Sequence, residues 1–378
     1  MDPDRDLAAS LPPLSAFHRI CFALLVGLLL VAGVALRFFH LGEKPYWYDE
    51  VCTSIRLSGH GRDIQGQVPV GEFDLEELRS WAVSVPKANW IDTWRSLGKD
   101  NAHQTPLYYM LAQSWVKCWG GSVAVRRSFS AWVSLLAFPL LYWLCLELWG
   151  SHRIAGLAIG FLAVSPIHVL YAQEARCYAL WVVMTLASSA ALLRALRVQD
   201  RMSWAFYAVT ITLGLYTHLF FGLVVLAHAA CMVKESGWSV RRPLQWRFSG
   251  PLAAYLTATV PAVILFSPWL LNVVQGYAQI HACTEWARKP TPWSMRFQGW
   301  RHGCSSLVVD VAREVEPWHA RWVAQVAVIL LVGCAVTHLW RQSPSRARTL
   351  LLCLIAVPFA GLLLPDLIEG GARSTVPR

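Results

Sequence analysis

Long apolar runs recur through this chain, and they restrict its fold more than any other feature of the sequence. The runs cover residues 18–39, 127–148, 154–171, 177–196, 204–218, 220–233, 251–274, 321–340 and 349–364. A helix needs about 17–25 mainly apolar residues to cross the hydrocarbon core of a bilayer. Because water is absent there, a crossing segment must satisfy its own backbone hydrogen bonds, which favours helices. The sequence therefore predicts an all-α polytopic membrane protein with about nine spans.

The composition agrees with a membrane environment and argues against a nucleic-acid-binding protein. Apolar residues make up 56% of the chain, charged residues make up 15%, and 20 residues are tryptophan. Indole rings favour the membrane–water interface. The formal net charge of +10 would suit nucleic acid, but the basic residues are spread through the short connections between apolar runs. That spread is typical of the positive-inside rule, so we exclude nucleic acid as a partner.

The same charge distribution predicts the orientation of the chain. If residues 1–17 are cytoplasmic, the short basic connections all lie inside and both long polar segments lie outside. The inner connections are residues 150–153, 198–203, 234–248 and 341–348. The outer connections are residues 40–126, 173–176, the turn at 218, residues 275–320 and the tail 365–378. Residues 18–364 then form one transmembrane module.

The first outer segment, residues 40–126, is too rich in tryptophan for an unstructured linker. Residues 74–81 and 91–97 have the apolar spacing of amphipathic helices, which we expect to lie on the bilayer surface. Residues 106–119 are apolar but short, and we expect a partly inserted helix there. If this helix crossed the membrane, every later segment would invert.

Polar and ionisable residues gather on the outer side, at the boundaries of the apolar runs. They are Asp49, Glu50, His103, Gln104, Gln173, Glu174, Arg176, Tyr178, His218, Arg373 and Arg378. Each has a simpler interpretation taken alone, such as a solvated helix end, a helix cap or a local ion pair. Taken together, carboxylate, imidazole and guanidinium groups at one bilayer surface indicate a functional site.

Such a set suits transfer from an anionic, lipid-linked donor. A carboxylate can accept the proton of an acceptor hydroxyl as it attacks. A guanidinium group can stabilise the phosphate that leaves, because its planar shape matches two phosphate oxygens.

Four stretches of the chain resemble motifs of the GT-C superfamily of integral membrane glycosyltransferases. They are residues 41–50 (LGEKPYWYDE), 103–109 (HQTPLYY), 165–180 (SPIHVLYAQEARCYAL) and 216–218 (YTH), in the order and at the helix boundaries of that family. The resemblance is greatest to the protein-mannosyltransferase-like and aminoarabinose-transferase-like branch, which includes glycosyltransferase family 39 and its RgtA/B/C/D-type kin. It implies a GT-C-like helix bundle in a bacterial inner membrane.

The resemblance also implies roles for individual residues. Asp49 would be the catalytic base, with Glu50 and Glu174 as further acidic catalytic residues. The substrate-binding positions would be His103, Gln173, Arg176, Tyr178, His218 and Arg378, with Arg176 on the donor phosphate. The implied reaction is an inverting transfer from a polyprenyl-phosphate sugar to a lipid, glycan or protein acceptor. No cofactor is required, although Asp49, Glu174 and His103 could hold a divalent metal ion.

Two other functions remain open at this point. A transporter of a lipid-linked or anionic solute would carry ionisable residues at the bilayer midplane and internal repeats, neither of which is evident. A non-catalytic assembly or sensor protein would use the outer loops to bind a partner. The tail resembles a segment that continues into more membrane helices in the family, so we expect either a fragment or a shortened enzyme.

Overall fold

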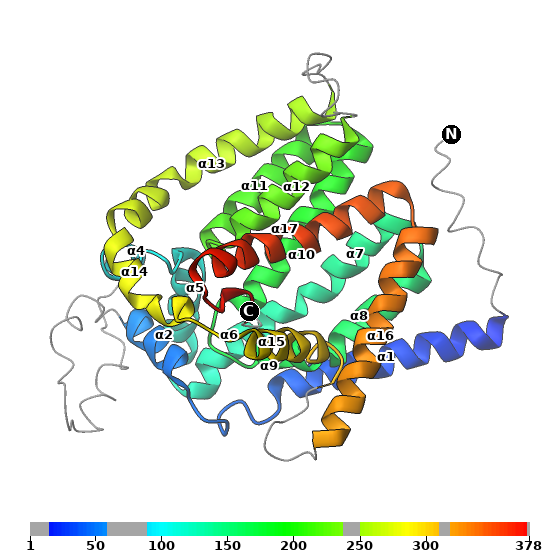
Figure 1. The fold of residues 1–378 in the computed structure, drawn as a ribbon, viewed down its shortest axis with the longest axis horizontal. Helices are drawn as coiled ribbons and strands as arrows, with labels where there is room; N and C mark the ends of the chain where they lie inside the picture. The colour runs from blue at the N-terminus through cyan, green and yellow to red at the C-terminus, as the bar shows by residue number, and fades with distance from the viewer. Residues whose placement is uncertain (1–14, 59–88, 237–249, 310–317, 376–378) are drawn as a thin grey trace.

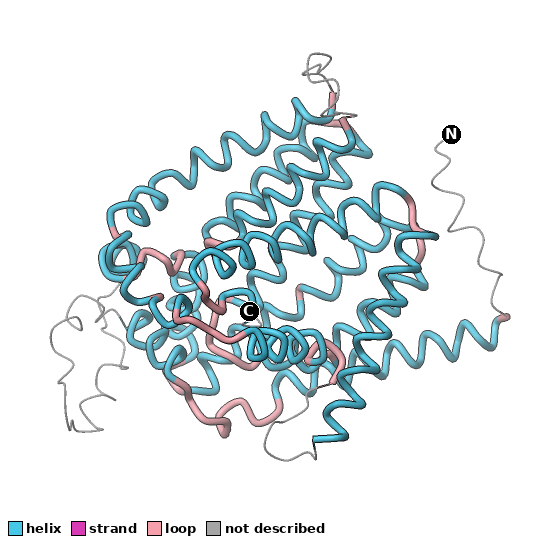
Figure 2. The backbone as a smooth tube through the Cα atoms, in the orientation of Figure 1, coloured by secondary structure: helices cyan, strands magenta, loops and turns pink. Residues whose placement is uncertain are grey.

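The computed structural model describes residues 15–58, 89–236, 250–309 and 318–375, and its regular structure is helical throughout (Figures 1 and 2). Within these ranges no strand occurs, which confirms the all-α prediction for this part of the chain. The helix predicted at residues 74–81 lies outside the described residues, and so does Arg378.

Six helices in the described ranges are long and apolar enough to cross a membrane. They are α1 (Ala16–Phe38), the joined pair α6 (Val123–Leu135) and α7 (Ala137–Trp149), α10 (Tyr178–Val198), α13 (Pro251–Gln275), α16 (Trp318–Gln342) and α17 (Ser345–Glu369). A bent pair, α8 (His152–Val164) and α9 (Pro166–Ala172), adds a seventh if it counts as one span. The helices α11 (Arg201–Thr217) and α12 (Phe221–Glu235) have only 17 and 15 residues. Length and composition thus support six or seven of the nine predicted spans.

The bundle has two ends, which we name the Phe38 end and the Arg201 end after residues at helix termini. At the Phe38 end, α1 finishes and α10 begins, and at the Arg201 end, α10 finishes and α11 begins. Helices α11 and α13 both start at the Arg201 end and pack side by side (Figure 1). All the residues of the predicted site that are described lie toward the Phe38 end.

The predicted continuous helix at residues 154–171 is wrong, because the chain bends by 61° between α8 and α9. Pro166 causes the break. Proline lacks an N–H group and disfavours helical backbone at the residue before it. Ser165 accordingly adopts an extended conformation, with φ −63° and ψ 122°.

The bend leaves two carbonyl groups of α8 without their usual helical donors, and Arg37 replaces those donors. Pro166 has no N–H to offer to Leu162, and the Ile167 N–H donates instead to the Ser306 carbonyl. The buried Arg37 guanidinium donates to the carbonyls of Ala163 at 2.6 Å and Leu162 at 3.2 Å. A buried polar group without a partner costs free energy, so Arg37 makes the bend tolerable inside an apolar bundle.

The helix predicted to end at residue 364 continues through Pro365 to Glu369, so the predicted start of the tail is wrong. Proline removes only one hydrogen bond from an established helix. The next residue, the buried Asp366, then receives the backbone N–H groups of Arg373 and Ser374 at 2.8 and 2.6 Å. The chain after α17 therefore folds back on the end of the helix.

Shorter helices cover the Phe38 end. The expected helix at residues 91–97 is present as α4 (Trp90–Asp100), and the expected helix at residues 106–119 is α5 (Pro106–Trp119). A third, α2 (Tyr48–Ser58), was not predicted as a helix. Beyond α13 lie α14 (Tyr277–Cys283), η4 (Glu285–Arg288) and α15 (Trp293–Ser305), and η5 (Arg373–Thr375) follows α17.

The Arg201 end is strongly basic. The described residues at the helix termini there include Arg19, Arg153, Arg194, Arg197, Arg201, Lys234, Arg341, Arg346 and Arg348, against Glu147, Asp200 and Glu235. Two of these acids are paired, since Glu147 contacts Arg197 and Glu235 contacts Arg346. The excess of positive charge is typical of a cytoplasmic membrane surface.

Close packing of α1 on α8 generates a first prediction. A Cβ atom on Gly33 would lie 2.5 Å from the Ala163 carbonyl oxygen, whereas one on Gly27 would meet nothing within 4 Å. We expect Gly33→Ala to destabilise the protein by about 1–3 kcal/mol through overpacking. Thermal unfolding in detergent measures this, with Gly27→Ala as the matched control in the same helix. Equal melting temperatures for both variants would contradict the packing.

Candidate functional site

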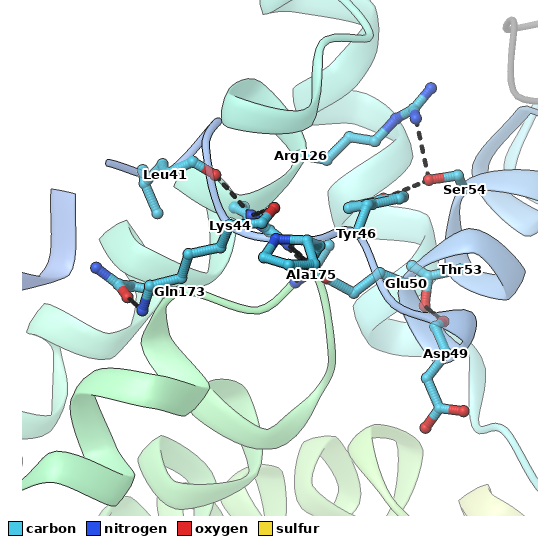
Figure 3. A network of polar contacts seen from close by, with 12 residues as sticks. Leu41, Lys44, Tyr46, Asp49, Glu50, Thr53, Ser54, Arg126, Gln173 and Ala175 are labelled. Carbon is cyan, nitrogen blue, oxygen red and sulfur yellow. Dashed lines mark hydrogen bonds and ion pairs between the residues drawn. The ribbon is translucent and has the colours of Figure 1, made fainter. Parts of the chain in front are cut away.

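Two adjacent carboxylates in the first turn of α2 point in different directions. Acidic side chains are favoured near a helix N-terminus, where the partial charge is positive. Successive helical residues are about 100° apart, so Glu50 turns into the protein and is 0% exposed. The Asp49 side chain remains 23% exposed and extends away from the polar network around Glu50 (Figure 3).

Glu50 forms a buried, bidentate ion pair with Arg127 of α6, which we call the Glu50–Arg127 clamp. The Arg127 Nε and Nη2 atoms donate to the two carboxylate oxygens at 2.8 and 2.7 Å. The remaining donors reach the carbonyls of Leu41, Lys44 and Pro45 at 2.8, 3.1 and 2.9 Å. A guanidinium group has five N–H donors, and Arg127 uses all of them. The clamp thereby fixes the chain between α1 and α2.

The clamp also holds the connection between α9 and α10, residues 173–177. The Ala175 N–H donates to Glu50 Oε1 at 2.8 Å. Gln173 reinforces this contact, because its Nε2 donates to the Phe39 carbonyl at 3.0 Å and its Oε1 accepts from Lys44 Nζ. Three segments that are distant in sequence therefore meet around one carboxylate (Figure 3).

Arg176 lies beside the exposed carboxylate. Its Nη2 atom is 3.4 Å from Asp49 Oδ2, and its Nη1 atom donates to Thr53 Oγ1 at 3.2 Å. The hydroxyl oxygen of Tyr109 accepts a weaker hydrogen bond from Nη1 at 3.5 Å. Arg176 is only 5% exposed, and its Nε has no acceptor among the described residues. The site thus contains a buried cation with an unused donor beside a carboxylate that solvent can reach.

The Glu174 carboxyl group is tuned to titrate near neutral pH. Burial raises its pKa to about 7, and the charges of Glu50 and Asp49 act in the same direction. Arg176 and Arg127 oppose the shift without cancelling it. One carboxyl oxygen, Oε2, is buried with no hydrogen-bond partner in the described part of the chain. Perturbed carboxyl groups of this kind are frequent at functional sites.

Aromatic rings connect Arg176 to His218. The Tyr178 ring lies 5.6 Å from Arg176 Cζ and 6.4 Å from the His218 ring. His218 stacks on Trp181 with centroids 4.2 Å apart and accepts the Phe220 N–H on Nδ1 at 3.1 Å. This bond leaves Nε2 as the protonated nitrogen of a neutral ring.

His103 occupies the turn between α4 and α5, beside Gln104. The Gln104 side-chain oxygen accepts from the Tyr109 hydroxyl at 2.8 Å, and that hydroxyl contacts Arg176. The residue next to His103 in the chain is thus linked to Arg176 through one tyrosine hydroxyl.

The described residues do not present a preformed metal site. Among residues 15–58, 89–236, 250–309 and 318–375, no group of three or more His, Cys, Asp and Glu residues is placed to hold an ion. Asp49, Glu174 and His103 thus lack the clustering of a metal centre in this arrangement, and metal dependence stays a prediction.

Sequence reasoning missed Arg127, Tyr109 and Thr53. Arg127 carried a signal, because Arg126 and Arg127 stand at the start of an apolar helix, where the helix dipole opposes positive charge. The predicted orientation also placed them outside, against the positive-inside rule. Two arginines at a position that both the helix dipole and the positive-inside rule disfavour indicate a buried carboxylate partner. Tyr109 and Thr53 carried no comparable signal.

Comparison with known proteins identifies one relevant similarity. No family model matches the chain. The chain is similar to an undecaprenyl phosphate-alpha-4-amino-4-deoxy-L-arabinose arabinosyl transferase of Pectobacterium carotovorum subsp. carotovorum (strain PC1), with 27% identity over 241 residues. The match covers 61% of this chain and 39% of the relative, so the chain spans about two fifths of that protein's length. With its apolar helices, the chain is an integral membrane protein.

The Glu50–Arg127 clamp generates the second prediction. Glu50→Gln removes one charge and leaves Arg127 buried without its counterion, so we expect a loss of about 3–5 kcal/mol in stability. Thermal unfolding of the purified protein measures the loss. Glu43→Gln is the control, because the Glu43 side chain is 71% exposed in its pair with His40. A Glu50 variant as stable as this control would show that the clamp is not needed.

Proposed function

We propose that this protein is a membrane glycosyltransferase that moves a sugar from a polyprenyl-phosphate donor to an acceptor hydroxyl. The observation that carries the proposal is the solvent-accessible Asp49 carboxylate, 3.4 Å from the buried Arg176 cation at one end of an apolar bundle. The arabinosyl transferase similarity supports a lipid-phosphate donor. The acceptor is a lipid, a glycan or a protein hydroxyl.

Asp49 acts as the general base in this proposal. The acceptor oxygen forms a bond to the anomeric carbon while Asp49 takes the hydroxyl proton. The bond between that carbon and the phosphate oxygen breaks, and its electron pair leaves with the polyprenyl phosphate. Attack from the face opposite the phosphate inverts the configuration at the anomeric carbon. The partial exposure of Asp49 gives a hydrophilic acceptor access to the base.

Arg176 binds the donor phosphate in this proposal. Its guanidinium group is oriented by Thr53, Tyr109 and Asp49, so little side-chain entropy is lost when the phosphate arrives. The Nε atom without an acceptor supplies a donor for a phosphate oxygen. Because a monophosphate leaving group can be stabilised by such donors, the reaction demands no metal. Tyr178 and His218 would line the pocket for the donor beside Arg176.

Glu50 and Gln173, expected from the sequence to act on substrate, are better assigned as positioning residues. Both Glu50 oxygens are occupied by Arg127 and Ala175, and Glu50 is fully buried. The Gln173 amide is similarly bonded to Lys44 and the end of α1. Neither side chain offers a free polar atom to a ligand. Each therefore acts by fixing the position of Asp49 relative to Arg176.

We propose that the Phe38 end faces the extracytoplasmic side. The excess of basic residues at the Arg201 end supports a cytoplasmic location for that end. The donor's polyprenyl chain would then lie along the bundle in the outer leaflet, with the phosphate at the level of Arg176. His103 and Arg378 stay proposed substrate contacts, and Arg378 lies outside the described residues.

The third prediction tests Asp49 as the base. Asp49→Asn should lower transfer from a labelled polyprenyl-phosphate sugar by about 10²–10⁴-fold, the usual contribution of a general base. The melting temperature should equal that of the wild type, because Asp49 is partly exposed and lies 3.4 Å from Arg176, a longer distance than in the Glu50–Arg127 clamp. Glu285→Gln, which removes an exposed carboxylate in η4, is the control. Full activity in the Asp49 variant would exclude this role.

The fourth prediction concerns pH. The Glu174 carboxyl is neutral below its pKa of about 7 and becomes charged above it. The charged form would repel an anionic donor beside Arg176, so kcat/KM should fall as pH rises through about 7. Glu174→Gln should remove this decline between pH 6 and pH 8, because glutamine stays neutral. An unchanged profile in the variant would assign the titration to another group.

A further inference from the structure

A groove of ≈ 450 Å³ lies between α11 and α13 at the Arg201 end of the bundle. Its mouth at Arg201 is separated from His218 at the Phe38 end by the 17 residues of α11, a distance of about 25 Å at 1.5 Å per residue. Its volume is within the roughly 300–1,000 Å³ typical of small-molecule sites. The proposed transfer reaction makes no use of it.

Half of the residues that line the groove are small and apolar, and Trp204 and Thr257 complete its floor. The small apolar residues are Ala205 and Ala208 on α11 and Ala254, Ala258 and Pro261 on α13. Ala205 and Pro261 are exposed, so the groove opens sideways on the outer surface of the bundle. An uncharged floor along a helix that crosses the membrane suits an alkyl chain better than a water-soluble ligand.

The mouth of the groove is polar and contains one acidic and one basic side chain. Gln199, Asp200 and Arg201 line it. The Asp200 carboxylate is already occupied as the N-cap of α11, where it accepts the Ser203 N–H at 2.7 Å. Hydrogen bonds from Ser203 lower the pKa of Asp200, and the nearby charge of Arg194 acts in the same direction. Arg201 is exposed. The surrounding helix ends carry the basic excess described above, so an anionic group is favoured at this mouth.

We propose that this groove binds an anionic phospholipid of the surrounding bilayer, with the phosphate at Arg201 and one acyl chain along the alanine floor. Basic pockets between membrane helices recognise anionic head groups in this way. The lining runs from Arg201 to Ala208, about 10 Å of helix, which matches the upper part of an acyl chain. The glycosyl donor is excluded as the occupant, because Arg176 lies at the opposite end of the bundle.

Native mass spectrometry of the full chain tests this proposal. The protein, in mild detergent, is equilibrated with equal amounts of phosphatidylglycerol and phosphatidylethanolamine, and bound lipids are counted. We expect one phosphatidylglycerol to be retained preferentially. Arg201→Gln should weaken its binding about fivefold, the effect of one cation near an anionic surface. Ala205→Leu should fill the groove and reduce the occupancy of either lipid by at least about fivefold.

Two control variants separate the groove from general surface effects. Arg341→Gln removes an exposed cation at the same end of the bundle, and Ala327→Leu adds the same side chain on an exposed face of α16. Both should retain the lipid as the wild type does. Equal retention in all four variants would overturn the proposal. So would equal binding of the two phospholipids by the wild type, or displacement of the lipid by undecaprenyl phosphate.

Discussion

The Glu50–Arg127 clamp is the interaction on which the site depends. It is a buried charge pair in which all five arginine donors are used, and the carboxylate also accepts the Ala175 N–H. Removing two charges from water is expensive, so such a pair contributes little net stability compared with apolar packing. The clamp instead fixes the relative positions of three segments. It joins α2, α6 and the connection after α9, and this junction sets the distance between Asp49 and Arg176.

Buried polar groups are also paired in the apolar part of the bundle. Pro166 breaks a helix in an apolar setting, and Arg37 takes over the carbonyls that the break exposes. Close contact of Gly33 with Ala163 brings α1 near enough for this repair. The bend directs α9 toward the Phe38 end, where Ser165 and Ile167 bond to the end of α15. The short helices at the Phe38 end are thereby tied to the connection that carries Arg176.

The lengths of the apolar runs were sufficient to predict the all-α fold and the helix at residues 106–119. The charges of the connections between the runs predicted that Asp49, Glu174, Arg176 and His218 lie at one end. The prediction failed at residues 154–171 because hydropathy does not register the helical hydrogen bond that Pro166 cannot donate. It also missed α2, whose polar inner face resembles a loop until the burial of Glu50 is known. Among the site residues, the role of each carboxylate could not be predicted, because a one-residue step on a helix decides which one is exposed.

The contact between Ala175 and Glu50 also determines when the site can exist during synthesis. Residues 50 and 127 must first pair across 77 positions, and residue 175 joins them across 125. Chain closure over such separations delays assembly. A chain emerging from the ribosome therefore holds Asp49 before it holds Arg176. Asp49 and Arg176 can come together only after α8 and α9 have been synthesised, because both helices precede Arg176 in the chain.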